Sequence, residues 1–295
     1  MHNRITYKAG ATKEIIHCYP REDRKSTQRE PVKKKTPEEI REANKRQAAR
    51  KLERLMNANF RPGDWHITLT YRKEIRPSPE EAREELKKFL GCLRRRYRKA
   101  GHELKYIVAT EYRSKHIHHH LVVNAINTGG EMTAAMVREL WAVRRGQDGI
   151  RGNPKFVMLY DSGEYSQLAD YLIKETERTF RDEDSAVKQR YSCSRNLTKP
   201  KKTVERMQGR TWRRDPRPQK GYYILPDSVF NGYDRMGYPY QRYVMVKIKP
   251  SDSDWEQRGR SSVGMSQDTR SHKDSHRPRA GGERRGHERH KRNDQ

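Results

Sequence analysis

The ten residues Lys-His-Ile-His-His-His-Leu-Val-Val-Asn, at positions 115–124, alternate histidines with aliphatic side chains. Side chains two positions apart lie on the same face of a β-strand, so His116, His118 and His120 can point in one direction. The Leu-Val-Val that follows anchors the strand in a core. Three imidazoles on one face of a sheet are suited to holding a divalent metal ion. The alternative is an exposed, histidine-rich strand that binds nothing.

The segments on either side have the patterns of further strands and helices. Residues 64–72 alternate apolar and polar side chains, which predicts a half-buried strand. A helix follows, in which Ser78 is the N-cap, Glu81 completes a capping box, and apolar residues recur at helical spacing as far as Gly101. Residues 104–112 form the next strand, which we expect to pair with the histidine strand as a hairpin.

Three more elements complete the predicted domain. Residues 133–145 form a second helix, residues 154–160 a short strand, and residues 164–178 a third helix. The order β-α-β-β-α-β-α predicts an α+β fold of the ferredoxin-like, split β-α-β type. We expect helices on one face of its antiparallel sheet and the histidines on the open face.

The third predicted helix carries a second group of polar side chains. Tyr171, Lys174, Glu175 and Arg178 fall at i, i+3, i+4 and i+7 and share one helical face. A tyrosine beside cations is suited to attack on a phosphate. Because free tyrosine has a pKa of about 10, attack at neutral pH needs a nearby cation or metal ion. The alternative is an ordinary amphipathic helix with a solvated charged face.

Taken together, these motifs resemble the HUH endonucleases, in particular the single-tyrosine rolling-circle replication initiators of plasmids, phages and mobile elements. The shared motifs are an apolar strand at residues 67–71, a histidine strand followed at once by aliphatics, and a helical Tyr-x-x-Lys at residues 171–174. They span residues 64–178. The tyrosine lies C-terminal to the histidines, whereas the related relaxases have theirs N-terminal.

The resemblance implies a metal site and its ligands. His118 and His120 would bind the ion, with Glu111 of the preceding strand as a third ligand, and the ion would be Mg²⁺ or Mn²⁺. The literal His-hydrophobe-His pattern also fits His116 and His118, which leaves the register of the ligands open by two residues.

The implied activity is that of a site-specific endonuclease and ligase for single-stranded DNA. Tyr171 would form a 5′-phosphotyrosine and Lys174 would position the phosphate, and the nick in single-stranded or hairpin origin DNA would start rolling-circle replication. Tyr165 is the next candidate nucleophile, while Tyr71 fits the core better. Two alternatives stay open: a single-strand HUH transposase, and a non-catalytic nucleic-acid-binding protein on the same fold.

The charge of the chain favours a polyanionic partner. It has 66 Lys and Arg against 39 Asp and Glu, a formal net charge of +27, and residues 251–295 hold only 11 of those basic and 8 of those acidic side chains. Most of the excess therefore lies in the part that we expect to fold, where it would grip nucleic acid by counterion release. A ribosomal-type or membrane-surface protein would also be basic, but would need no histidine strand. The expected DNA contacts are Arg178, Arg195, Lys199, Lys201 and Lys202.

The pattern along the chain predicts three parts. Residues 1–60 are a basic extension with a helix at about 37–57, residues 61–250 are the catalytic domain with C-terminal additions, and residues 251–295 are a disordered polar tail.

Composition also predicts location and partners. Three scattered cysteines indicate a reducing compartment, and neither a signal region nor a membrane-spanning stretch is evident. We expect the cytoplasm of a bacterial host and a gene on a mobile element. Without a P-loop motif of its own, the chain would depend on a host helicase and a DNA polymerase.

Overall fold

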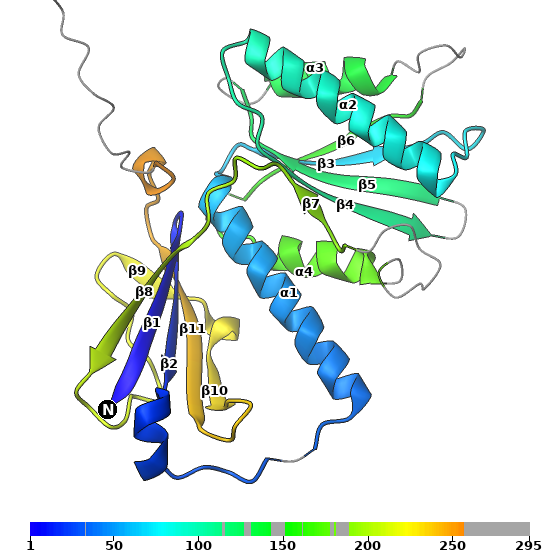
Figure 1. The fold of residues 1–295 in the computed structure, drawn as a ribbon. Helices are drawn as coiled ribbons and strands as arrows, with labels where there is room; N and C mark the ends of the chain where they lie inside the picture. Colours follow the sequence, from blue (N-terminus) through cyan, green and yellow to red (C-terminus); the bar gives the residue numbers. More distant parts are fainter. Residues whose placement is uncertain are drawn as a thin grey trace, which may run out of the picture. The chain divides into compact units, whose positions relative to one another are not determined.

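Two antiparallel sheets organise the chain in the computed structural model (Figure 1). The structure describes residues 1–32, 34–113, 116–126, 131–142, 151–160, 162–177, 180 and 189–256. The chain divides into a unit of Met1–Gln257 and a unit of Arg258–Gln295, and all of the described residues belong to the first unit. The fold class is α+β, as the sequence predicts.

The first sheet, which we call the site sheet, has the strand order β6-β3-β5-β4-β7. Its strands are β3 (Trp65–Thr70), β4 (Tyr106–Arg113), β5 (His116–Val123), β6 (Lys155–Met158) and β7 (Ser192–Cys193). The helices are α1 (Pro37–Asn59), α2 (Pro79–Lys99), α3 (Glu131–Ala142) and α4 (Ser166–Glu175). From β3 to α4 the elements follow the predicted split β-α-β order. The histidine strand β5 is the central strand of the sheet, and it pairs with β4 as a hairpin.

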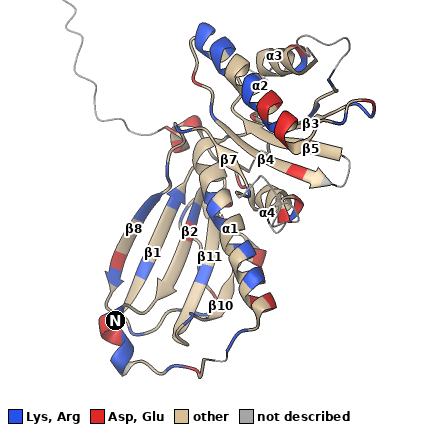
Figure 2. Cartoon of the chain, turned by 45° about the vertical axis from the view of Figure 1, so that its right-hand side comes forward, with Lys and Arg blue, Asp and Glu red and all other residues tan. Residues whose placement is uncertain are grey.

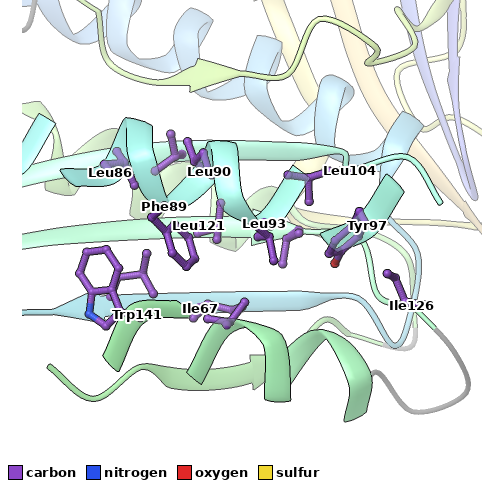
Figure 3. Close-up of a cluster of buried hydrophobic side chains, with 14 residues drawn as sticks. Ile67, Leu86, Phe89, Leu90, Leu93, Tyr97, Leu104, Leu121, Ile126 and Trp141 are labelled. Atoms are coloured by element: carbon purple, nitrogen blue, oxygen red, sulfur yellow. The ribbon is translucent and has the colours of Figure 1, made fainter. Parts of the chain in front are cut away.

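One face of the site sheet is covered by α2 and α3. The helix α2 begins at the predicted capping box of Ser78 and Glu81, and its acidic first turn and basic last turn oppose the helix dipole (Figure 2). Its apolar stripe packs on the strands, with Leu93 against the cluster that contains Leu121, and Trp141 of α3 joins the same cluster (Figure 3). These side chains are fully buried, so this layer contains the main core of the domain.

Helices cover the opposite face as well. Leu52 of α1 and Leu172 of α4 are buried there together with Val122 of β5. The apolar sides of α1 and α4 need such a partner, because a helix gains most of its stability from burying its apolar face. The face that we expected to be open is therefore open only at its histidine end, where the His118 side chain is 37% exposed and Tyr171 is 41% exposed.

The second sheet, which we call the terminal sheet, has the order β10-β11-β2-β1-β8, and β9 pairs with β11. Its strands are β1 (His2–Ala9), β2 (Thr12–Cys18), β8 (Lys201–Met207), β9 (Tyr222–Ile224), β10 (Phe230–Tyr233) and β11 (Pro239–Lys247). Short 3-10 helices are η1 (Arg21–Ser26), η3 (Pro226–Ser228) and η4 (Asp252–Asp254).

The terminal sheet joins segments that the sequence analysis assigned to different parts. β1 pairs with β8 and β2 pairs with β11, so the first residues of the chain form one sheet with residues beyond 200. Local patterns cannot reveal such a pairing, because the partner strands are distant in sequence.

Candidate active site

The register of β5 separates its histidines into two groups. Glu111 of β4 stands directly opposite His118, and Ala109 stands opposite His120. His118, His120 and Glu111 therefore lie on the face that α1 and α4 cover in part. His119 points the other way, into the core, where its ring meets the ring of Trp141 edge-on.

The two histidines converge on one carboxylate. The Oε2 atom of Glu111 lies 3.6 Å from Nε2 of His120 and 3.8 Å from Nδ1 of His118. Glu111 and His120 are buried, while His118 is partly exposed. On its other side, Nδ1 of His120 lies 3.5 Å from the hydroxyl of Thr68, which helps to fix the ring. The structure thus brings together the three ligands that the resemblance implies.

His120 is kept neutral by its surroundings. Burial, with a smaller contribution from the neighbouring His118, lowers the pKa of His120 to about 4, while Glu175 acts in the opposite direction. The imidazole is therefore uncharged at pH 7, and a nitrogen lone pair is available to a ligand. Its Nε2 atom is buried and has no hydrogen-bond partner among the described residues.

His66 is a member of this group that sequence reasoning missed. Its ring stacks on that of His120 with centroids 5.6 Å apart, and its buried Nε2 atom likewise has no hydrogen-bond partner in the described part of the chain. Burial, followed by His120, lowers the pKa of His66 to about 4. The signal was present in the sequence, since His66 alternates with Thr68 on the polar side of its strand. It became meaningful only once β3 was known to pair with β5.

Tyr171 stands over the histidines from α4. Its ring lies 5.3 Å from the ring of His120 at 88°, and 6.2 Å from that of His66 at 70°. The helix is fixed by the buried residues Leu168 and Leu172, which place Tyr171 on its outer side. The predicted tyrosine and the predicted histidines therefore meet in space, although they are about 50 residues apart in sequence.

The other two tyrosines do not reach this group. Tyr165, at the N-cap of α4, is fully buried in the cluster between the sheet and the helices α1 and α4. The hydroxyl of Tyr71 lies 3.1 Å from Nε2 of His119, on the α2 and α3 side. Burial strongly raises the pKa of Tyr71, as expected for a core residue. Tyr171 is thus the tyrosine with access both to solvent and to the histidines.

The remaining predicted site residues are placed as follows. Lys174 is exposed one turn after Tyr171, and Glu175 is partly buried near His120. His116 is exposed at the start of β5, opposite Arg113, two residues further from the His120 ring than His118. Arg178 lies outside the described residues.

The expected DNA-contacting residues on the C-terminal side are not part of the histidine group. Exposed Arg195 lines a pocket of about 640 Å³ with Arg94, Arg98 and His102, next to Tyr106 at the far end of β4 from Glu111. The exposed residue Lys199 precedes β8. Lys201 and Lys202 lie in β8 of the terminal sheet, opposite Lys8 and Tyr7.

Glu111, His118 and His120 offer the kinds of atoms that bind metal ions, but their present arrangement is not that of a formed metal site. Two imidazoles and a carboxylate suit Mn²⁺ and are acceptable to Mg²⁺. The Nε2 atom of His120 faces Glu111 and forms no hydrogen bond with the described residues, so its lone pair can bind a metal ion. Within the described ranges, however, no three His, Cys, Asp or Glu side chains are arranged so that they could hold a metal ion as they stand.

Comparison with known proteins identifies a related family. Residues 64–180 match the family model of the replication-associated protein ORF2. The match covers β3 through α4 and includes Glu111, both convergent histidines and Tyr171. It is consistent with a rolling-circle replication initiator and supports a role in DNA replication. No curated protein and no solved structure matches the chain. Among the described residues, no helix has both the length and the apolar character needed to cross a membrane.

Proposed function

We propose that this protein nicks and rejoins single-stranded or hairpin DNA at an origin and so starts rolling-circle replication. The observation that carries the proposal is the position of Tyr171, whose ring stands perpendicular to that of His120 at 5.3 Å and is open to solvent. The match to a replication-associated family favours replication over transposition as the setting.

The proposed reaction is a transesterification at phosphorus. The Tyr171 hydroxyl oxygen attacks the scissile phosphate and gives up its proton, and a Tyr–O–P bond forms as the P–O3′ bond breaks. The departing oxygen takes up a proton and becomes a free 3′-hydroxyl, while the 5′ end of the DNA stays on Tyr171. Because one phosphodiester replaces another, the bond energy is kept, and a later attack by a 3′-hydroxyl can reseal the strand.

Each neighbouring residue has a part in this reaction. Glu111, His118 and His120 would hold Mg²⁺ or Mn²⁺ with the lone pairs and the charge that converge there. Such an ion, when bound, polarises the phosphate and stabilises charge that develops on it. Exposed Lys174, one turn from Tyr171, attracts and positions the DNA phosphate by its charge.

The proposed product defines the partners. A free 3′-hydroxyl is a primer for a host DNA polymerase, and the sequence has no P-loop of its own to drive strand separation, so a host helicase is needed. We place the reaction in the cytoplasm of a bacterial host, on a replicon such as a plasmid.

The test is covalent trapping. The protein is incubated with a library of single-stranded oligonucleotides labelled at the 3′ end, with Mn²⁺ or with a chelator, and separated on a denaturing gel. We expect a labelled protein band that needs metal and is absent from Tyr171→Phe. Tyr160→Phe is the matched control, because Tyr160 is 46% exposed and Tyr171 is 41% exposed. A band of normal strength from Tyr171→Phe would refute the assignment.

A further inference from the structure

The loop that joins β8 to β9, residues 208–221, is strongly basic and belongs to the terminal sheet rather than to the site sheet. It holds five basic side chains and one acidic side chain, Asp215. All five cations are exposed, whereas Trp212, in their midst, is partly buried. The five are Arg210, Arg213, Arg214, Arg217 and Lys220.

The backbone of this loop is fastened to the sheet. Four side chains of the sheet and its neighbouring segments donate hydrogen bonds to the loop's carbonyl oxygens. The Gln241 amide donates to the carbonyls of both Arg213 and Arg214, at 2.7 and 3.0 Å. The other contacts are His2 to Gly209 at 2.8 Å, Tyr19 to Arg210, and Asn231 to Arg214 at 3.1 Å. A backbone held at four carbonyls fixes the points from which its side chains project.

The Trp212 side chain anchors the loop to aromatic side chains of β1, β2 and the segment after β2. Its ring stacks on His17 at 5.5 Å and 23°, and it meets His2 at 5.0 Å and Tyr19 at 5.3 Å. Two prolines, Pro216 and Pro218, further restrict the backbone of the same loop. The loop therefore has a hydrophobic anchor on the side of the sheet, while its cations are on the solvent side.

Within the described part of the chain, several cations of the terminal sheet are neutralised by acids, whereas the five cations of the loop are not. Arg4 pairs with Glu205, Arg206 pairs with Asp23 at 2.6 Å, and Lys247 pairs with Asp254 at 2.8 Å. None of the five loop cations forms an ion pair with an acid in the described ranges. Their mutual repulsion is then not offset within the described fold, and they are available to an external anion.

We propose that the loop at residues 208–221 is a second DNA-binding element, which grips the phosphate backbone of duplex DNA independently of its sequence. An anchored loop suits the regular phosphates of a duplex, because the loop backbone does not have to be ordered on binding. Figure 2 shows further Lys and Arg positions along β8 and β1 of the same sheet. The proposal rests on the proposed function only in choosing DNA as the polyanion.

The test compares two double variants of equal charge. Binding of a labelled 30-base-pair duplex of arbitrary sequence is measured by fluorescence anisotropy over a range of salt concentrations. For Arg213→Ala with Arg214→Ala, we expect affinity to fall roughly ten- to a hundredfold at 0.1 M salt, and the slope of log K against log salt to shrink by about 2. These substitutions keep the backbone carbonyls that Gln241 binds, so the loop stays anchored.

The control removes two exposed lysines from α2, with Lys87→Ala and Lys88→Ala, and should leave the salt slope close to that of the wild type. An unchanged slope in the loop variant, or an equal loss in the control, would overturn the proposal. The Tyr171→Phe variant should bind the duplex normally. If Tyr171→Phe still forms the adduct, the proposed function fails while the duplex-binding result stands, and the reverse pattern rejects the loop alone.

Discussion

Replacement of His119 by leucine tests the strand register on which the whole site depends. His119 is fully buried, with Nδ1 at 2.9 Å from the Thr110 hydroxyl and Nε2 at 3.1 Å from the Tyr71 hydroxyl. Burial lowers its pKa to about 3, so the ring is neutral, with one donor and one acceptor for these hydroxyls.

The expected loss of stability follows from these contacts. His119→Leu leaves two partly buried hydroxyls with one partner fewer, at up to about 1–3 kcal/mol each, and removes an edge-to-face contact with Trp141 worth about 1 kcal/mol. Burial of the apolar leucine side chain offsets part of this loss of stability. We expect the free energy of unfolding to fall by about 2–5 kcal/mol, while DNA cleavage by the folded protein persists.

Urea unfolding and the adduct assay measure the two quantities separately. The double variant with Thr110→Val should recover part of the lost stability, because it removes one of the hydroxyls. Thr110 is a cleaner partner for this cycle than Tyr71, whose hydroxyl also interacts with Glu85. A His119→Leu protein of normal stability that no longer forms the adduct would place His119 in the site, and our register would be wrong.

Four further outcomes are expected. Glu111→Gln should abolish metal-dependent adduct formation and leave DNA affinity in a binding assay nearly unchanged, since the basic surface remains. Lys174→Ala should slow adduct formation in a time course without preventing it. Burial raises the pKa of Asp64 from 3.8 to about 6, so the folded state keeps its proton longer, and the free energy of unfolding should fall by roughly 3 kcal/mol between about pH 4 and pH 6. In urea unfolding, Asp64→Asn should lack this part of the pH dependence. Truncation before Gln257 should preserve cleavage of a short oligonucleotide.

Elements with strong local signals were predictable from the sequence. The capping boxes at Thr36 and Ser78 fixed the starts of α1 and α2, because a capping residue and its glutamate lie three positions apart. Alternation in β3 likewise identified the buried side of that strand, as Ile67 and Leu69 confirm. Such signals depend on neighbours in the chain and need no knowledge of the fold.

Other features depend on contacts that the sequence does not display. The strand β1 has few aliphatic residues, and its partner β8 is exposed along nearly its whole length, so neither has the usual alternation of a half-buried strand. Their pairing becomes visible only in the assembled sheet. The anchoring of the loop at residues 208–221 could not be predicted for the same reason, because its hydrogen-bond donors lie on four different segments.

The position of the candidate nucleophile shows how the two kinds of information combine. Helical spacing predicted that Tyr171 and Lys174 share a face, but spacing alone cannot say what that face meets. The packing of Leu172 decides this. Leu172 is buried in the same cluster as Val122 of β5, and this contact sets the rotation of α4 about its axis relative to the sheet. That packing brings the Tyr171 ring to the edge of His120, two residues before Val122 on the same face of β5. A cavity at Leu172, as in Leu172→Ala, should therefore slow adduct formation as well as lower stability, although Leu172 contributes no polar group to the reaction.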